Sequence, residues 1–195
     1  MLSKILKGIK DPFRAYRTVR SIGLGHWYRF WYRITGKKVR IGKNFRVNGR
    51  LSCKGPGTVY IGDNVVIGMT VTPWTFDDNA VISIGDGTFL NGTRFACEKS
   101  IKIGKNVILA DCRIMDTDFH GLDPDNRHIH KSAPIIIGDN VWITIASVIL
   151  KGVTIGHGST ITPNSVVTEA VPSRVVYGGN PGRIIKQLKA LRKAS

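Results

Sequence analysis

The chain has 195 residues, a formal net charge of +16 and 42% hydrophobic residues, which fits one folded domain with its appendages. No apolar run approaches the roughly 18 residues of a membrane span, and the basic start lacks the uncharged core of a signal peptide. Three cysteines (Cys53, Cys97, Cys112), an odd number without paired spacing, argue against a disulfide framework. We therefore expect a cytoplasmic protein whose thiols are small buried residues.

Positive charge gathers at the two ends of the chain. Residues 1–50 hold 14 Lys and Arg against a single acidic residue, and residues 171–195 hold six basic residues and no acidic one. The stretch between them is mildly acidic. The basic character therefore belongs to the ends and not to the central part of the chain.

Residues 1–40 are expected to be a basic, aromatic-rich helical segment. Asp11-Pro12 is typical of an N-cap followed by proline in the first turn, and Gly36 predicts the end of a second helix near 26–34. On the first helix one apolar face is predicted, formed by Ile5, Ile9, Phe13 and Tyr16.

Three interpretations of this segment stay open. Basic amphipathic helices with Trp and Tyr suit an anionic membrane surface, which predicts peripheral association through residues 1–36. The helices could instead pack on the rest of the domain or on a neighbouring subunit. Nucleic-acid binding has charge in its favour but no recognition motif, so no nucleic-acid partner is expected.

Residues 41–178 carry aliphatic residues at intervals of six, the signature of a hexapeptide β-helix in which three six-residue units make one triangular coil. The inward positions in the second half are Ile137, Ile143, Ile149, Ile155, Ile161 and Val167. Upstream the expected inward positions are Ile61, Ile67, Ile84, Leu90, Ala96, Ile103, Leu109 and Met115. At least four to five coils are implied, with Gly, Asp and Asn after each Ile at corners that need positive φ.

The register is interrupted over residues 116–134, and a long loop on a regular solenoid is usually functional. It contains His120, His128 and His130. A neutral histidine held by a carboxylate can act as a general base toward a hydroxyl, and Asp116 and Asp118 are the nearest carboxylates in sequence. The last segment, residues 179–195, is predicted to form an amphipathic helix.

The repeats, the His-containing excursion, the run Ile137-Gly138-Asp139-Asn140-Val141-Trp142-Ile143 and the tripeptide Gly179-Asn180-Pro181 resemble the hexapeptide-repeat acetyltransferases. The likeness covers roughly residues 55–190 and is greatest to the maltose, galactoside and polysaccharide O-acetyltransferases. It implies an all-β, left-handed parallel β-helix, a homotrimer, and acetyl-CoA bound in the groove between adjacent subunits.

The resemblance also implies roles for single residues. His120 matches the catalytic histidine, and the backbone N–H of Ile145 matches the donor to the oxyanion. Asp118 is taken as the carboxylate of His120 because it is near in sequence, and a carboxylate from another coil is the alternative. Asn91 and Asp116 are expected at the acceptor, and Trp142 is expected to pack under the loop. The coenzyme A positions are Ile145, Pro163, Thr168, Glu169, Arg183 and Lys186, where Pro163 and Glu169 depart from the small residue and the lysine usual in the family.

The expected activity is therefore acetyl-CoA-dependent O-acetylation of a saccharide hydroxyl, with a bacterial surface polysaccharide as the setting and no metal. N-acetylation of a nucleotide-linked amino sugar and a non-catalytic scaffold are alternatives. A γ-type carbonic anhydrase shares the fold and binds zinc through three histidines, but its ligand pair is separated by four residues, whereas one residue separates His128 from His130.

Overall fold

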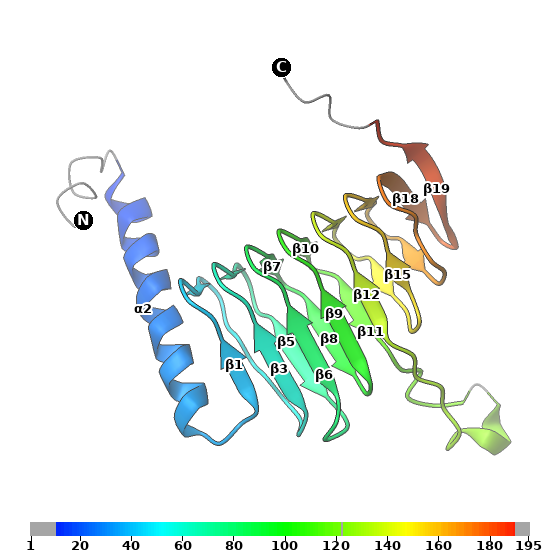
Figure 1. Ribbon diagram of the computed structural model, residues 1–195, viewed down its shortest axis with the longest axis horizontal. Coiled ribbons are helices and arrows are strands. Elements are labelled where there is room, and N and C mark those ends of the chain that lie inside the picture. The colour runs from blue at the N-terminus through cyan, green and yellow to red at the C-terminus, as the bar shows by residue number, and fades with distance from the viewer. Residues whose placement is uncertain (1–10, 122, 190–195) are drawn as a thin grey trace.

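The computed structural model describes residues 11–121 and 123–189, which form one long helix followed by a parallel β-helix (Figure 1). The helix α2, Pro12–Ile34, lies across the first coil, and the coils then follow one another away from the helix, from left to right in Figure 1, through three sheets. A six-stranded parallel sheet confirms the expected number of coils, and the helix at the start confirms the helical segment.

The strands group by face of the triangular prism. Sheet A contains β1 (Val39–Ile41), β3 (Thr58–Ile61), β6 (Val81–Ile84), β9 (Ser100–Ile103), β12 (Ile135–Ile137) and β15 (Thr154–Ile155). Sheet B contains β2 (Arg46–Val47), β4 (Val66–Ile67), β7 (Phe89–Asn91), β10 (Ile108–Ala110), β13 (Trp142–Ile143), β16 (Thr160–Ile161), β18 (Val175–Gly179) and β19 (Gly182–Gln187). Sheet C contains β5 (Thr72–Thr75), β8 (Arg94–Cys97), β11 (Arg113–Met115), β14 (Val148–Ile149) and β17 (Val166–Val167).

The core is a set of aliphatic ladders inside the prism. All six inward positions predicted between Ile137 and Val167 are buried, and register pairs such as Ile143 with Ile161 stack one coil apart. The register fails on sheet C of the earlier coils, where Phe95 and Ile114 point inward while Ala96 and Met115 line the outer face. The next inward residue after Leu90 is Phe95, five positions later, whereas the next inward residue after Ile143 is Ile149, six positions later. The corner after Leu90 is therefore one residue shorter, and each side chain of β8 lies on the face opposite to the one that a strict six-residue period predicts.

The Gly, Asp and Asn residues of the Ile-Gly-Asp-Asn repeat each have a distinct structural role. The Asp carboxylate accepts a backbone N–H from the preceding coil, as when Asp86 Oδ1 accepts from Asp63 N at 2.9 Å. Gly62 is needed because a Cβ there would come within 2.5 Å of Asp86 Oδ1, and its own φ is not positive. The left-handed residue is the fourth one, for example Asn64 at φ 59°. Glycine in this motif therefore serves close packing of coils, and asparagine serves the turn.

Helix α2 is continuous and covers the start of the β-helix, so the expected break between two helices is absent within residues 12–34. Asp11 caps it by accepting from Phe13 N and Arg14 N, as predicted, and it ends at Ile34 before Gly36 at φ 68°. The predicted positions Ile5 and Ile9 lie outside the described residues.

The inner side of α2 satisfies backbone groups of the first coil. The hydroxyl oxygens of Tyr28 and Tyr32 accept the N–H groups of Leu51 (3.3 Å) and Cys53 (3.1 Å). Gly25 is buried against the Phe45 backbone, where an added Cβ would overlap the carbonyl oxygen. The packing interpretation of this segment is therefore correct for one face of the helix.

We expect Gly25→Ala to destabilise the protein by about 1–3 kcal/mol, because backbone on both sides must move to admit the methyl group. Gly23→Ala is the matched control, since no atom lies within 4 Å of its added Cβ. That substitution should stabilise by about 0.5–1 kcal/mol through helix propensity. Urea unfolding measures both, and equal effects of the two substitutions would contradict the packing described for Gly25.

The predicted C-terminal helix is wrong over residues 182–187. This stretch is the strand β19, paired antiparallel with β18 at the end of sheet B. The last coil leaves an open strand edge, and the β-branched pair Ile184 and Ile185 suits a strand that completes it.

Two further expectations concern composition. Cys53, Cys97 and Cys112 are all free and buried, as predicted for small wall residues. Within residues 11–121 and 123–189 no helix is long and apolar enough to span a membrane.

Candidate active site

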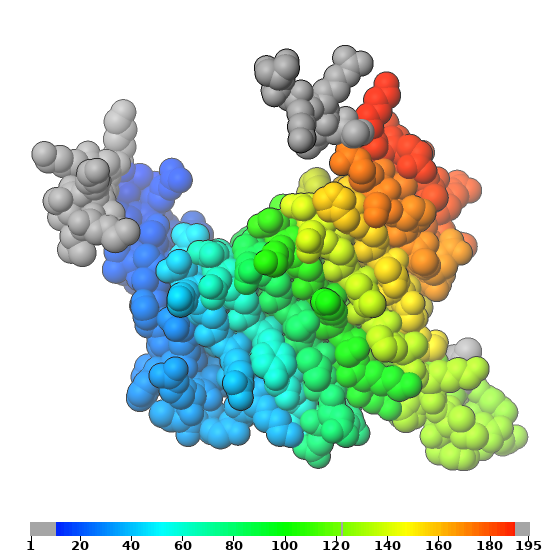
Figure 2. All heavy atoms as spheres, viewed as in Figure 1, coloured from blue at the N-terminus to red at the C-terminus, as the bar shows by residue number. Residues whose placement is uncertain are grey.

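The excursion over residues 116–134 leaves the prism at the corner between sheets C and A and stands out from the body of the molecule (Figure 2). Its base is closed by backbone pairing, with Asp118 N donating to Lys131 O at 3.0 Å and Ala133 N to Asp116 O at 2.9 Å. A short 3-10 turn, Pro124–Asn126, lies farther out and is capped by Asp123. The loop is thus anchored at both ends on one corner of the solenoid.

His120 lies near this base, is exposed, and makes no hydrogen bond to the described residues. The preceding residue, Phe119, has φ 63°, which is an unfavourable conformation for a non-glycine residue. Its N–H donates to Thr117 Oγ1 at 3.2 Å, and its ring packs edge-on against Phe76 at a centroid distance of 4.9 Å. These contacts hold the strained turn that presents His120.

The carboxylates expected near His120 have other partners. Asp118 Oδ1 accepts from Lys151 Nζ at 2.6 Å, so it pairs with a lysine and not with the histidine. Asp116 is fully buried and accepts from Glu98 N at 2.7 Å and Lys99 N at 2.9 Å. Asp116 therefore ties one coil to the next and has no exposed surface within one protomer, and its contact with the acceptor stays a prediction.

A histidine–carboxylate pair does exist in the loop, but it uses His130. Its Nε2 lies 2.9 Å from both carboxylate oxygens of Glu98, and Glu98 Oε2 also accepts from Thr117 Oγ1 at 2.6 Å. The hydrogen bond to Glu98 raises the pKa of His130, and the hydrogen bonds from Thr117 and His130 lower the pKa of Glu98. Glu98 is 32 residues from His130, so sequence proximity gave no sign of this pair.

We expect the order of this loop to depend on pH. The raised pKa of His130 stabilises the folded loop below about pH 6.5, and this contribution is lost as the pH rises through the raised value. The lowered pKa of Glu98 means that the ionised carboxylate also stabilises the folded loop above the usual pKa of a glutamate. This contribution is lost as the pH falls through the lowered value, when Glu98 takes up a proton.

Amide hydrogen exchange of residues 117–134, expressed as protection relative to the intrinsic exchange rate at each pH, should therefore show most protection in mildly acidic solution and less on either side. His130→Gln should flatten the alkaline limb while His128→Gln, an exposed neighbour, should leave it in place. An unchanged profile in His130→Gln would show that the pair does not hold the loop.

The opposite edge of sheet C carries Asn91, Ile145 and Pro163. All three lie at the corner between sheets B and C, where Asn164 N donates to Ile145 O at 3.1 Å. The side chain of Ile145 is 53% exposed, and its N–H has no hydrogen-bond partner within the described residues. This free amide is available to an incoming oxygen.

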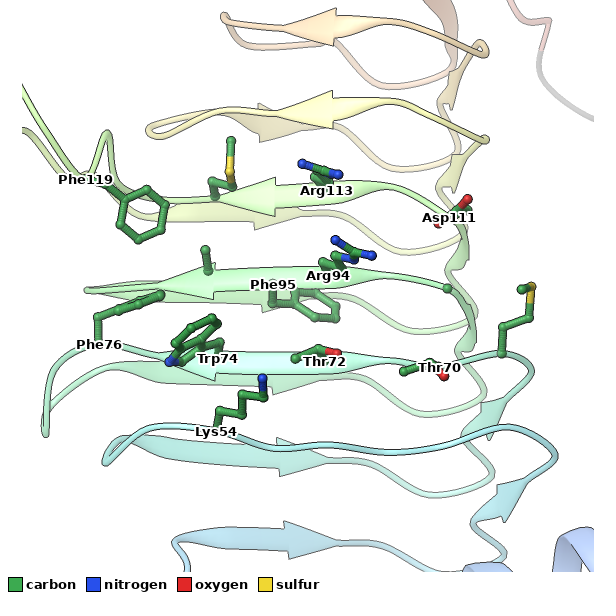
Figure 3. A pocket seen from close by; sticks show the side chains of 14 residues that line it. Lys54, Thr70, Thr72, Trp74, Phe76, Arg94, Phe95, Asp111, Arg113 and Phe119 are labelled. Carbon is green, nitrogen blue, oxygen red and sulfur yellow. The ribbon is translucent and has the colours of Figure 1, made fainter. Parts of the chain in front are cut away.

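His120 and Ile145 lie on different edges of the same protomer. Figure 3 shows Phe119, the neighbour of His120, at one end of the sheet C strands and Asp111 at the other. Ala146, next to Ile145, donates its N–H to Asp111 O at 3.0 Å. Five residue steps of chain lead from Asp111 at one corner to Asp116 at the base of the loop, which is roughly 15 Å at about 3.3 Å per residue, so one protomer does not bring the two groups together.

The remaining predicted coenzyme A positions are also dispersed. Thr168 and Glu169 follow β17 at the corner between sheets C and A, and both are exposed. Tyr177 donates its hydroxyl proton to Gly182 O at 2.8 Å, with Glu169 Oε1 at 3.3 Å. Arg183 and Lys186 are exposed on β19, where cations can reach a phosphate.

The outer face of sheet B carries an apolar ladder. Phe89, Ile108 and Trp142 are in register on β7, β10 and β13, and each is more than a third exposed. Trp142 therefore does not pack under the loop, which begins at a different corner. Because Ile145 follows two residues after this strand, the ladder borders the free amide.

Among residues 11–121 and 123–189, no group of three His, Cys, Asp or Glu side chains is arranged to hold a metal ion.

Comparison with known proteins agrees with the fold and the repeat. A model for the bacterial transferase hexapeptide (six repeats) matches residues 134–169. Galactoside O-acetyltransferase of Escherichia coli is 34% identical over 119 residues, which are 60% of this chain and 59% of that protein. The chain spans about three fifths of the length of the curated relatives that it matches.

Two solved structures are similar over most of the chain. A hexapeptide-repeat acetyltransferase of Vibrio cholerae in complex with acetyl coenzyme A has a TM-score of 0.59 and 26% identity, covering 89% of this chain and 84% of that one. A polysialic acid O-acetyltransferase has a TM-score of 0.66 and 28% identity, covering 80% and 78%.

Proposed function

Because the chain belongs to the hexapeptide-repeat acetyltransferases by repeat, fold and relatives, we propose that it transfers the acetyl group of acetyl-CoA to a hydroxyl of a saccharide. The observation that carries the proposal is His120, an exposed histidine on the loop base with no intramolecular hydrogen bond. A polysaccharide O-acetyltransferase among the structural neighbours supports a surface polysaccharide as the acceptor.

In this proposal His120 acts as the general base. One ring nitrogen takes the proton of the acceptor hydroxyl while the hydroxyl oxygen forms a bond to the acetyl carbon and the carbon–sulfur bond breaks. The proton then passes from His120 to the departing sulfur, so His120 returns to its neutral state. The Ile145 N–H donates to the carbonyl oxygen as negative charge develops on it. No covalent bond between enzyme and acetyl group is needed.

The residues present fit coenzyme A. Ile145 offers an exposed apolar side chain and a free amide at one corner, and Arg183 and Lys186 are exposed cations that can pair with phosphates. Glu169 cannot supply such a cation. Pro163 is exposed at its corner, so it can line a narrow channel through its ring and backbone.

We place each active site between two subunits of a homotrimer. His120 and the Ile145 amide lie on opposite edges of sheet C, so a complete site needs His120 from one protomer and Ile145 from the next. The exposed ladder of Phe89, Ile108 and Trp142 beside Ile145 provides an apolar surface for the neighbouring protomer.

The test of the function is release of free thiol from acetyl-CoA by the purified protein, with a panel of oligosaccharides, lipid-linked glycans and nucleotide-linked amino sugars. Thiol release that requires a sugar hydroxyl supports O-acetylation. Release only with amino sugars would point to N-acetylation, and failure to bind coenzyme A would leave a scaffold.

We further propose that the enzyme works at the cytoplasmic face of a membrane, bound peripherally through α2. The outer side of this helix presents Trp27, Phe30 and Trp31, which are 44–56% exposed and packed on one another, with Trp27 and Trp31 stacked at 5.9 Å. Arg14 and Arg17 lie on the same helix, so aromatic and cationic groups occur together as on membrane-surface helices.

Vesicles containing phosphatidylglycerol should therefore co-sediment with the protein, and Trp27→Ser/Phe30→Ser/Trp31→Ser should weaken this binding about tenfold or more. Tyr28 and Tyr32 stay in place in this variant, so the first coil keeps its cap. Ile136→Ser, an exposed apolar residue of sheet A, is the control. Equal binding of wild type and the triple variant would refute the membrane proposal.

A further inference from the structure

The outer face of sheet C is hollowed into a groove of about 660 Å³ that the proposed chemistry does not yet use (Figure 3). Trp74, Phe76 and Phe119 line one part of it, with Lys54 beside Trp74, and Arg94 and Arg113 line the next part. The groove thus combines aromatic surface with positive charge on three successive strands and the coil before them.

Its cationic part is built by the register of the coils. Arg94 on β8 pairs directly with Arg113 on β11, so two guanidinium side chains project from one face of adjacent strands about 4.8 Å apart. Neither forms a salt bridge within the described residues. Like charges at directly opposed positions repel each other, and a bound anion would relieve that repulsion. Asp111 is the one carboxylate in the lining, and it lies beyond Arg94 and Arg113, at the end of the groove away from Phe119 (Figure 3).

Its aromatic part leads to the proposed base. Trp74 and Phe76 stack at 4.9 Å, both more than 40% exposed, and Phe119 meets Phe76 edge-on. Lys54 Nζ lies 4.9 Å from the centre of the Trp74 ring. An aromatic wall can cover the apolar face of a sugar ring, and the residue after Phe119 is His120.

From this arrangement we infer that the groove binds the acceptor and that the acceptor is an anionic saccharide. Its negative group lies on Arg94 and Arg113, a neighbouring sugar ring lies on Trp74 and Phe76, and its hydroxyl extends toward His120. This inference rests on the proposed acetyl transfer. The negative group is either the carboxylate of an acidic sugar or the phosphate of a linked sugar, since guanidinium groups bind both in the same way.

Direct binding by titration calorimetry at low salt tests the groove without any turnover. One pair of probes is a glucuronate-containing tetrasaccharide and the same tetrasaccharide with its carboxylates reduced to alcohols. A second pair is glucose 1-phosphate and glucose. The variant is Arg94→Gln/Arg113→Gln, and the matched control is Arg40→Gln/Arg46→Gln, two exposed arginines on the other two sheets. Coenzyme A is titrated into every protein as a separate ligand.

We expect one charged probe to bind about tenfold or more tightly than its neutral partner, and the preference to vanish in Arg94→Gln/Arg113→Gln but not in the control. The pair that shows the preference identifies carboxylate or phosphate. Equal binding of charged and neutral probes, or a preference that survives in the double variant, would overturn the inference. The inference would also be overturned if coenzyme A bound more weakly to Arg94→Gln/Arg113→Gln but normally to the control variant, because the groove would then hold the nucleotide.

The proposed function can fail separately. Suppose that the protein binds the acidic probe through Arg94 and Arg113 yet neither binds coenzyme A nor releases thiol. In that case the groove would still be a site for anionic saccharides, and the proposed acetyl transfer would be refuted. Circular dichroism melting of both double variants shows that the fold is intact.

Discussion

His120→Ala is expected to reduce acetyl transfer by about 10²–10⁴-fold, because removal of the imidazole removes the group that takes the hydroxyl proton. Coenzyme A affinity should change little, since His120 lies on the loop and not among the residues proposed to hold the nucleotide. Saccharide-dependent thiol release measures the rate, and titration of coenzyme A measures the affinity. Unfolding should occur at the wild-type urea concentration, because the exposed His120 side chain makes no hydrogen bond to the described residues.

His128→Ala is the control, since this histidine is exposed on the same loop without a proposed role. His130→Ala separates the base from loop order: it removes the pair with Glu98 and should lower the rate through a less ordered loop. If His130→Ala abolished transfer and His120→Ala left it unchanged, the base would be His130 with Glu98 as its carboxylate.

Mixed trimers should regain activity that neither parent variant has. Ile145→Pro removes the free amide proposed to donate to the carbonyl oxygen and should cost about 10²–10³ in rate. When His120→Ala and Ile145→Pro chains are co-expressed in equal amounts, random assembly places an intact histidine against an intact amide in about one quarter of the sites. Thiol release should then approach a quarter of the wild-type value.

Ile145→Ala keeps the N–H and should keep most of the activity, which separates the backbone donor from the side chain. A site contained within one protomer makes the opposite prediction for the mixture, since each chain would lack one of the two groups. Mixed trimers no more active than the parents would therefore contradict the placement between subunits.

Much of the fold was predictable because each coil has to bury an aliphatic residue at the same positions. An inward aliphatic residue at every sixth position can be buried in only one way, and all positions from Ile137 to Val167 obey it. The period alone did not predict that Ala96 and Met115 would face outward, because a corner shortened by one residue changes the face without changing the hydrophobic pattern. The strand Gly182–Gln187 was missed because its partner β18 exists only once the last coil has formed.

The candidate site was less predictable, since its contacts join distant parts of the chain. His120 was identified through the family resemblance, and its place there stays a prediction. The pairing of His130 with Glu98 and of Asp118 with Lys151 depends on which residues share a corner. The opposed guanidinium groups of Arg94 and Arg113 follow from a register in which residues 19 positions apart lie side by side.

The two ends of the solenoid also limit how far this architecture can grow. A stack of identical parallel coils presents unpaired backbone groups at each end and could add further chains into a fibre. At one end Tyr28 and Tyr32 of α2 occupy N–H groups of the first coil, and at the other β19 turns back antiparallel on β18. These two caps cover the ends whatever the number of coils between them, so extra 18-residue units inserted there would lengthen the rod without opening it to polymerisation.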